Sequence, residues 1–369
     1  MPSWMKQQGV RVLATTPAAT KAYWDVDCRG PVALLLSRTA ATPAGMIAAW
    51  RTGRAFLVIE PATPYARIQQ MLGLANASCV LVDEDARTCA YAETLAAHYA
   101  VIDVNDPPHA SAALPWLQTQ PNQIAYIVFT SGSTGAPKPV AICHRAAAAY
   151  LDGLVARLKL DHGLRYAIVS TFAADLGLTS VLPALAHGGA LVIAPYETAR
   201  NPDGLAAALR ATPVDFLKIV PGHLEALLAA QTPHDILPAR FLVLGGEGAR
   251  LSLLSTLKAL HPSCRIFNHY GPSETTIGVL MGEWDCVNTT ESIGFDLPLA
   301  GVKILVLDEE KRRVAEGRSG EIHIGGVTLA QGYLGQATQT QERFIRSPSG
   351  DGERLYRTGD LARFRDNGE

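Results

Sequence analysis

The chain has 369 residues, of which 48% are hydrophobic and 18% charged, and its formal net charge at pH 7 is −2. A chain of this length and composition can bury large cores, so we expect two or three packed globular units. The low charge and the absence of a basic run argue against nucleic acid as a partner. No segment has the roughly 18 consecutive apolar residues that span a bilayer, and no signal peptide opens the chain, so we expect a cytoplasmic protein with no membrane partner.

The six cysteines share no Cys-x-x-Cys spacing, and most lie beside apolar residues. This pattern is typical of reduced, buried thiols and not of a zinc site or a disulfide framework. They are Cys28, Cys79, Cys89, Cys143, Cys264 and Cys286.

In chain order, short runs rich in Val, Ile and Leu alternate with helix-length segments. Runs without polar alternation predict strands buried on both faces, and the alternation predicts βαβ units with parallel sheets. The expected strands are 31–37, 55–61, 79–84, 99–104, 125–129, 166–170, 190–195, 216–221 and 241–246, with helices at 202–211, 222–231 and 251–260 among others.

After about residue 285 the pattern changes to two strands, 302–310 and 320–326, around a polar turn, which predicts a small antiparallel unit. The expected fold class is therefore α/β, with parallel-rich sheets flanked by helices in two lobes plus this small β unit. We expect a first lobe at 1–120, a second lobe at 121–285 that holds the phosphate loop and the amino-acid site, and a β-rich subdomain at 286–369.

The segment AYIVFTSGSTGAPKPV, residues 125–140, is the most informative part of the sequence. A buried strand leads directly into glycines and hydroxyl residues, whose backbone N–H and O–H groups can converge on an anion, and Lys138 adds a positive charge. The alternative is a flexible Ser/Gly linker. The Walker A pattern of a P-loop is not satisfied. The candidate phosphate-binding residues are Thr130, Ser131, Gly132, Ser133, Thr134, Gly135 and Lys138.

TSGSTGAPK resembles the phosphate-binding loop of the adenylate-forming superfamily, which includes acyl-CoA synthetases, firefly luciferase and adenylation domains of nonribosomal peptide synthetases. Further segments resemble the family's other motifs in the same order. They are WRTGRAFLVIEPATP (50–64), NHYGPSETT (268–276), GEIHIGGVTLAQGYL (320–334) and YRTGDL (356–361).

The resemblance implies ATP and Mg²⁺ as cofactors and gives roles to individual residues. Tyr270 would offer its ring to adenine, Ser273 a hydroxyl near the α-phosphate, Glu274 a carboxylate to Mg²⁺, and Asp360 an acceptor to the ribose hydroxyls. From the residues alone, a Gly-Pro turn and a Thr-Gly-Asp turn remain the alternatives. The resemblance makes Lys138, Thr130 and Glu274 the catalytic set, and it adds Gly246, Asn268 and Gly271 to the nucleotide-binding residues.

Mapping the family's substrate-lining positions by motif spacing indicates an α-amino acid, most closely as in aspartate-activating domains. Asp175 would hold the α-ammonium group. Lys218 lies on the same side of its strand as Phe216, an apolar face on which an unpaired ammonium is costly, so it calls for an anion. The full mapped set is Asp175, Leu176, Thr179, Lys218, Val243, Gly245, His269, Ile277 and Gly278.

Each of the three titratable residues in this set has an ordinary alternative. Asp175 could cap a helix, Lys218 could extend to solvent from an edge strand, and His269 could be a half-buried histidine without a ligand. Together they favour aspartate as substrate, followed by asparagine.

Four features depart from the family's pattern. Pro139 stands where glycine is common and removes a backbone donor, and Gln331 replaces a frequent arginine. The start is short, and the chain stops just after YRTGDL, without the lysine-bearing lid subdomain. We therefore expect a core that binds ATP and amino acid but adenylates poorly. The resemblance implies a condensation domain and a carrier protein, which supplies phosphopantetheine, as partners. A nucleotide- or partner-binding remnant without turnover is the alternative.

Overall fold

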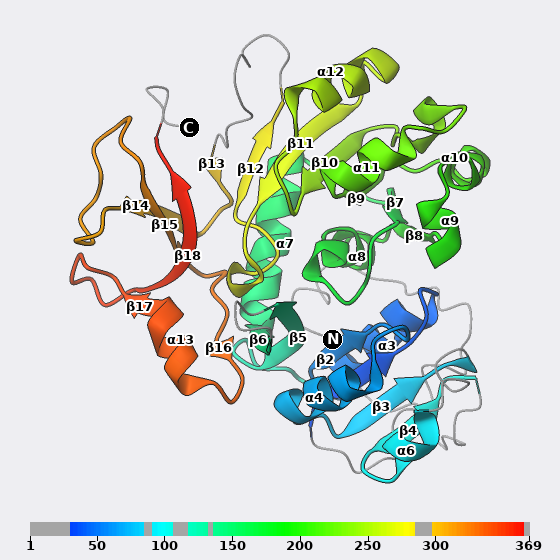
Figure 1. Ribbon diagram of the computed structural model, residues 1–369, viewed down its shortest axis with the longest axis horizontal. Coiled ribbons are helices and arrows are strands. Elements are labelled where there is room, and N and C mark those ends of the chain that lie inside the picture. Colours follow the sequence, from blue (N-terminus) through cyan, green and yellow to red (C-terminus); the bar gives the residue numbers. More distant parts are fainter. Residues whose placement is uncertain (1–29, 85–90, 106–116, 132–135, 285–296, 365–369) are drawn as a thin grey trace.

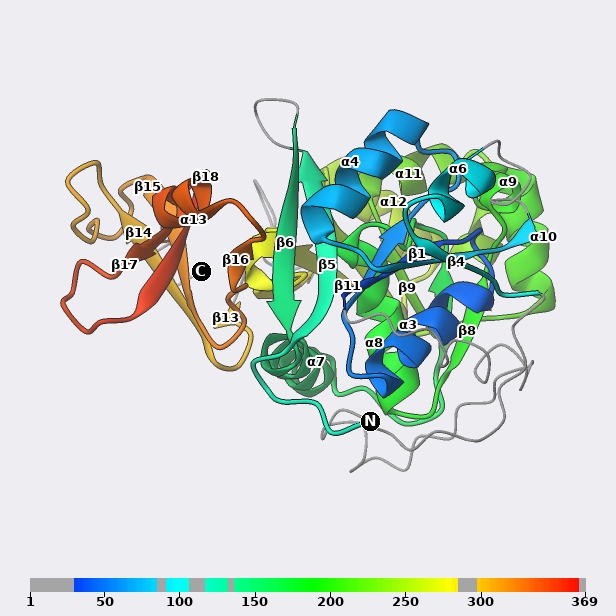
Figure 2. The same cartoon turned by 90° about the horizontal axis from the view of Figure 1, so that it is seen from below.

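The computed structural model describes residues 30–84, 91–105, 117–131, 136–284 and 297–364 (Figures 1 and 2). These residues form two seven-stranded sheets and one four-stranded sheet, with helices around them. None of the helices in this described part is long and apolar enough to cross a membrane.

The first sheet has the order β16-β6-β5-β2-β1-β3-β4 and is parallel from β5 to β4. Its central strands are apolar and buried, as the runs without polar alternation predict. A hairpin of β5 and β6 completes the sheet together with the short strand β16, both pairings being antiparallel. The bounds are β1 Val32–Leu35, β2 Phe56–Ile59, β3 Cys79–Val82, β4 Ala100–Asp103, β5 Ile124–Ser131, β6 Pro137–Cys143 and β16 Gly332–Tyr333.

The second sheet has the order β13-β12-β11-β10-β9-β7-β8 and is parallel except at β12 and β13. Three consecutive strands, β9, β10 and β11, lie at its centre and carry four of the nine mapped amino-acid positions. The bounds are β7 Arg165–Ile168, β8 Ala190–Ile193, β9 Phe216–Ile219, β10 Phe241–Gly245, β11 Arg265–Tyr270, β12 Leu280–Glu283 and β13 Leu297–Pro298.

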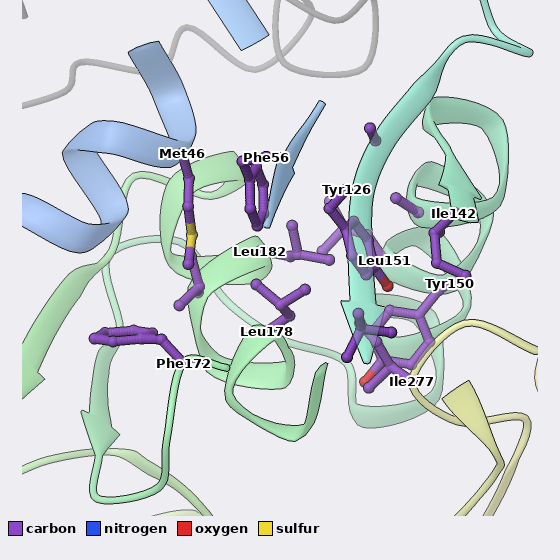
Figure 3. Packing of buried hydrophobic residues seen from close by; sticks show 14 of the residues in the cluster. Met46, Phe56, Tyr126, Ile142, Tyr150, Leu151, Phe172, Leu178, Leu182 and Ile277 are labelled. Carbon is purple, nitrogen blue, oxygen red and sulfur yellow. The ribbon is translucent and has the colours of Figure 1, made fainter. Parts of the chain in front are cut away.

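Helices α3 (Ala41–Arg51), α7 (His144–Leu158) and α8 (Leu178–Ala186) contribute to a core shared by the two large sheets. Figure 3 shows side chains from these helices and from the first sheet converging there, among them Phe56, Tyr150 and Leu182. Each sheet buries its other face against further helices: α4 (Tyr65–Ala75) on the first, and α10 (Pro202–Ala211), α11 (Pro221–Leu227) and α12 (Leu251–Leu260) on the second. The shorter helices are α6 (Ala92–Ala96) and α9 (Tyr196–Arg200).

The third sheet is antiparallel, has the order β14-β15-β18-β17, and lies to one side of the two large sheets (Figure 1). Helix α13 (Ala337–Arg343) connects β16 of the first sheet to β17 of the third. The bounds are β14 Val302–Leu307, β15 Gly320–Gly326, β17 Phe344–Arg346 and β18 Arg354–Ala362.

The sequence-based fold class is confirmed: two parallel-rich sheets with helices and one small antiparallel sheet. Helices α10 and α12 match the expected segments, whereas α11 ends at Leu227, before the expected 231. The Thr-Gly-Asp segment is not a turn, because its three residues lie within strand β18, where Gly359 takes a positive φ of 85°. Pro139 does not interrupt β6. The domain boundaries stay a prediction. Strands β5 and β6, which fall in the expected second lobe at 121–285, belong to the first sheet.

The side chain of Trp50 links α3 to β5, and its removal should destabilise the fold. Trp50 is fully buried and its Nε1–H donates to the carbonyl oxygen of Ala125 at 2.8 Å. Trp50→Phe leaves that buried acceptor without this donor and opens space, so we expect urea denaturation to report a loss of about 1–3 kcal/mol in the free energy of unfolding. Tyr196→Phe, at an exposed side chain, should change it by less than about 0.5 kcal/mol. Equal effects of both variants would contradict this role.

Candidate functional site

One face of strands β9, β10 and β11 carries the basic part of the candidate amino-acid site. Lys218 lies opposite Val243, and Gly245 lies opposite His269, so that these four residues point to the same side of the sheet. Because β9 lies between β7 and β10, Lys218 is not on an edge strand. Its side chain is 3% exposed, which rules out the alternative that it extends to solvent.

Lys218 and His269 are in direct contact. The Nζ of Lys218 lies 3.0 Å from Nδ1 of His269, and His269 is also buried. Burial lowers the pKa of Lys218 to about 7, although the Asp175 carboxylate partly opposes this effect. Burial and the nearby Lys218 charge hold the pKa of His269 well below its usual range, so the imidazole is neutral and can accept at Nδ1. Its proton is then on Nε2, a buried atom that has no hydrogen-bond partner in the described structure.

Two glycines make room for these polar groups. A Cβ on Gly245 would lie 2.3 Å from the Nζ of Lys218, and a Cβ on Gly278 would lie 2.0 Å from Nε2 of His269. Real Cβ atoms do not approach other heavy atoms this closely, so a side chain at either position would displace the basic pair. Glycine is therefore required at both positions for this arrangement.

Asp175 supplies the acidic part of the site. It lies inside the 3-10 helix η1 (Asp175–Gly177), whose N-cap residue is Ala174, so Asp175 is not the cap that the sequence alone left open. Burial raises its pKa, while a hydrogen bond with Ser273 opposes that shift. Its Oδ2 is buried and has no hydrogen-bond partner in the described residues. An acceptor in this state is suited to a cationic ligand group.

The remaining mapped residues lie around Asp175 and the Lys218–His269 pair. The hydroxyl of Tyr150, in α7, lies 3.1 Å from that of Thr179, and the Tyr150 ring is 5.9 Å from the His269 ring. Leu176 follows Asp175 in η1, and Ile277 belongs to the same core cluster as Tyr150 (Figure 3). The structure thus brings together all nine mapped positions: Asp175, Leu176, Thr179, Lys218, Val243, Gly245, His269, Ile277 and Gly278.

The β5–β6 hairpin positions the candidate phosphate-binding residues. Thr130 and Lys138 lie opposite each other near the end of the hairpin at which the chain passes from β5 to β6. Both side chains are partly exposed. The backbone of Ser131 is the last position of β5. Gly132, Ser133, Thr134 and Gly135 lie outside the described residues.

Glu274 is buried in the 3-10 helix η3 (Ser273–Thr275), directly after β11. The hydroxyl of Tyr333, in β16, donates to its Oε1 at 2.6 Å. Burial and the Glu274 carboxylate raise the pKa of Tyr333, so this hydroxyl keeps its proton. Gly271 lets the chain before η3 pass the chain after it, because a Cβ there would lie 2.4 Å from the Cα of Gly278.

Two of the candidate adenosine residues, Tyr270 and Asp360, meet between the second and third sheets. The hydroxyl of Tyr270, at the end of β11, donates to Oδ2 of the exposed Asp360 in β18 at 2.5 Å. Asn268 is buried in β11. Gly246 follows β10 with a φ of 95°, and a Cβ there would lie 3.3 Å from the side chain of Leu176.

The residues present fit a Mg²⁺ ion that is shared with a nucleotide. Among the described residues no group of three or more His, Cys, Asp or Glu side chains could hold a metal by itself. Mg²⁺ bound to ATP needs only one or two carboxylates, because phosphates and water complete its coordination. Glu274 can supply one, and Oε2 is the oxygen that the Tyr333 bond leaves open.

Two residues of the site carry contacts that sequence reasoning did not assign. Tyr333 lies in the segment 320–334 that resembles a family motif, but nothing in the sequence indicates its bond to Glu274. Tyr150 lies in an alanine-rich helix without any motif. Both contacts join residues 29 or more positions apart, which residue spacing cannot reveal.

Comparisons with known proteins show similarity over most of the chain. A family model described as AMP-binding enzyme matches residues 26–334. Surfactin synthase subunit 2 of Bacillus subtilis (strain 168) is 31% identical over 343 residues, which are 90% of this chain and 9% of that protein. Tyrocidine synthase 3 of Brevibacillus parabrevis is 31% identical over 341 residues, which are 91% of this chain and 5% of that protein. The chain thus spans less than a tenth of the length of these two relatives.

A solved structure is similar over most of the chain. It is the crystal structure of the nonribosomal peptide synthetase FmoA3 in its α-methyl-L-serine-AMP bound form. The TM-score is 0.85 at 26% sequence identity, and the match covers 95% of this chain and 40% of that chain.

The lowered pKa of Lys218 makes stability depend on pH. In the unfolded chain this lysine titrates near 10.5, and in the folded chain near 7. Between these values the unfolded state binds more protons, so the destabilising effect of burial is complete below about pH 7 and fades as the pH rises toward 10.5. Relative to Lys218→Met, the wild type should gain stability by up to about 1.4 kcal/mol per pH unit in this window.

Urea denaturation of both proteins at pH 7.0 and pH 9.5 measures this difference. Lys303→Met is the matched control, because Lys303 is a surface residue paired with Asp351 and Glu353. The difference in the free energy of unfolding between Lys303→Met and the wild type should be the same at the two pH values. A Lys218→Met difference that is equally independent of pH would show that Lys218 titrates normally.

Proposed function

Because the chain belongs to the AMP-binding enzyme family, we propose that it activates an amino acid with ATP as the adenylation unit of a nonribosomal peptide synthetase. The product is an aminoacyl-adenylate, and pyrophosphate is released. The similarity to FmoA3, whose bound ligand is itself an amino acid joined to AMP, supports this reaction class. The observation that carries the substrate assignment is the buried Lys218–His269 pair, with the Asp175 carboxylate within electrostatic range of Lys218.

The reaction needs positioning and charge neutralisation more than proton transfer. An amino-acid carboxylate is ionised at pH 7, so its oxygen can attack the α-phosphorus of ATP without a general base. A bond forms from that oxygen to the α-phosphorus while the bond from the α-phosphorus to the bridging oxygen breaks, and that oxygen leaves with pyrophosphate. Bound Mg²⁺ supplies charge neutralisation on the phosphates. Lys138 and the hydrogen-bond donors of the β5–β6 loop are the protein groups that neutralise phosphate charge.

The amino-acid and phosphate parts of the site adjoin through η3. Ser273 hydrogen-bonds Asp175, and the next residue, Glu274, carries the carboxylate assigned to the metal. Because Glu274 also raises the pKa of Asp175, the two carboxylates are close enough to interact. An α-ammonium group on Asp175 would hold the substrate beside the phosphate-binding hairpin, as in-line attack requires.

The favoured substrate is L-aspartate. Lys218 can donate a charged hydrogen bond, and Nε2–H of His269 is a second donor, with no partner among the described residues, so the basic pair can bind both oxygens of a side-chain carboxylate. Asparagine has nearly the same shape but no charge. Leaving a buried lysine without an anion costs about 3–5 kcal/mol, which corresponds to roughly 10²–10³ in discrimination. Glutamate is one methylene longer, and a packed site typically discriminates against one extra methylene by about 1–3 kcal/mol.

The partners follow from the synthetase assignment. The adenylate would be passed to the phosphopantetheine thiol of a carrier protein, and a condensation domain would use the loaded residue. The two relatives described above are many times longer than this chain, so a carrier protein and a condensation domain can belong to the same polypeptide in proteins of that length.

Exchange of labelled pyrophosphate into ATP, tested with the twenty amino acids, should be fastest with L-aspartate. Lys218→Met should reduce the affinity for aspartyl sulfamoyl adenosine, a non-hydrolysable adenylate analogue, by about 10²-fold or more, because the side-chain carboxylate loses its cation. Calorimetry should find a much smaller change with the asparaginyl analogue.

Lys303→Met serves again as the control, since it removes a lysine from the third sheet and leaves the site untouched. A preference for a neutral side chain over aspartate would show that the role of Lys218 is wrong. Exchange with none of the amino acids, together with ATP binding, would favour a nucleotide-binding domain without turnover.

A further inference from the structure

Tyr333 joins the phosphate-binding hairpin to the carboxylate assigned to the metal. It lies in β16, whose backbone pairs with β6 so that Tyr333 is opposite Val140, two residues after Lys138. Its hydroxyl donates to Oε1 of Glu274 at 2.6 Å, and both side chains are buried, with exposed fractions of 5% and 6%. A buried hydroxyl bound to a carboxylate is a strong, charge-assisted contact.

A second contact of Tyr333 is with the phosphate-loop lysine. The Nζ of Lys138 lies 5.6 Å from the centre of the Tyr333 ring, within the range of a cation–π interaction. Tyr333 therefore contacts the cation through its ring and the carboxylate through its hydroxyl. In the part of the chain that the structure describes, no ion pair joins Lys138 to Glu274.

Tyr333 is itself held firmly. Its backbone N–H donates to the hydroxyl of Thr340 at 3.0 Å, and its ring packs edge-on against Phe344 at 5.9 Å. Tyr356, in β18, lies within hydrogen-bonding reach of both Tyr333 and Glu274. The backbone of Glu274 is fixed as well, because its carbonyl accepts from the N–H of Ala330 at 2.9 Å. The hydroxyl–carboxylate contact therefore joins two segments that cannot easily move apart.

We propose that Tyr333 is a positioning residue that orients the Glu274 carboxylate for a divalent cation and keeps Lys138 from pairing with it. The hydroxyl occupies Oε1 and leaves Oε2 for the metal, while the ring separates the lysine from the carboxylate. Both charges then stay available, the cation for the phosphates and the anion for the metal. This inference rests on the proposed function, in which Glu274 binds Mg²⁺ together with ATP.

The physical reason lies in the opposite charges of the two groups. A lysine and a carboxylate that pair directly neutralise each other, and a phosphate or a metal would have to break that pair before binding. A carboxylate held by a hydroxyl is instead ready in one orientation. Residues that orient a metal ligand in this way typically affect metal affinity about 10–100-fold.

The test is the Mn²⁺ affinity of the Tyr333→Phe protein, measured by electron paramagnetic resonance in the presence of the ATP analogue AMPPNP. Phenylalanine keeps the ring beside Lys138 and removes only the hydroxyl. We expect Mn²⁺ to bind about 10–100-fold more weakly, whereas AMPPNP affinity in EDTA stays within about twofold of the wild type. A merely structural role would lower both affinities or neither.

Tyr166→Phe is the matched control, because Tyr166 is fully buried and its hydroxyl has no hydrogen-bond partner in the described structure. It should leave Mn²⁺ affinity unchanged. Unchanged Mn²⁺ affinity in Tyr333→Phe, with loss in Glu274→Gln, would overturn the role of Tyr333 alone. Unchanged affinity in Glu274→Gln would instead overturn the metal assignment of the proposed function.

Discussion

A lysine ammonium on the inner face of a central strand has to find an anion or lose its proton. Lys218 is in this position, because β9 is flanked by β7 and β10 and the face that it shares with Phe216 is covered by the core around α7 and α8. The protein supplies a neutral histidine as the closest contact and a more distant carboxylate, Asp175, and neither fully compensates for burial. The lowered pKa of Lys218 is the result of this incomplete compensation. A ligand with a side-chain carboxylate would supply the missing anion for Lys218, and this is the reason that aspartate is the proposed substrate.

The same constraint explains why the site is built on strands and glycines. Lys218, Gly245 and His269 come from three adjacent strands, so their spacing is fixed by the backbone ladder and not by loops. Rigid elements hold polar groups in place more accurately than loops do, which matters where two donors must meet two oxygens. From Asp175, which lies within electrostatic range of Lys218, contacts continue through Ser273 to Glu274, and from there through Tyr333 to Lys138. The amino-acid, metal and phosphate parts of the proposed site are thus connected by direct contacts.

The sequence predicted most of the strands because buried parallel strands are continuous apolar runs, as at β1, β2 and β10. It did not predict β6 as a strand, since Pro137 and Pro139 are unusual there, nor β18, in which Gly359 takes a positive φ. Within the candidate site, period-two alternation placed Lys218 on the face of Phe216 correctly. Neither pattern nor spacing could give the Lys218–His269 contact distance, the lack of a partner for Asp175 Oδ2 among the described residues, or the Tyr333–Glu274 bond. These features depend on tertiary packing between distant segments.

A crystal structure of the chain with aspartyl sulfamoyl adenosine tests the central claim most directly. The account predicts that the side-chain carboxylate of the ligand lies within about 3.2 Å of the Nζ of Lys218, a normal hydrogen-bond distance, with the α-ammonium group on Asp175. A ligand whose side-chain carboxylate faces solvent, with Lys218 still bound only to His269, would contradict it.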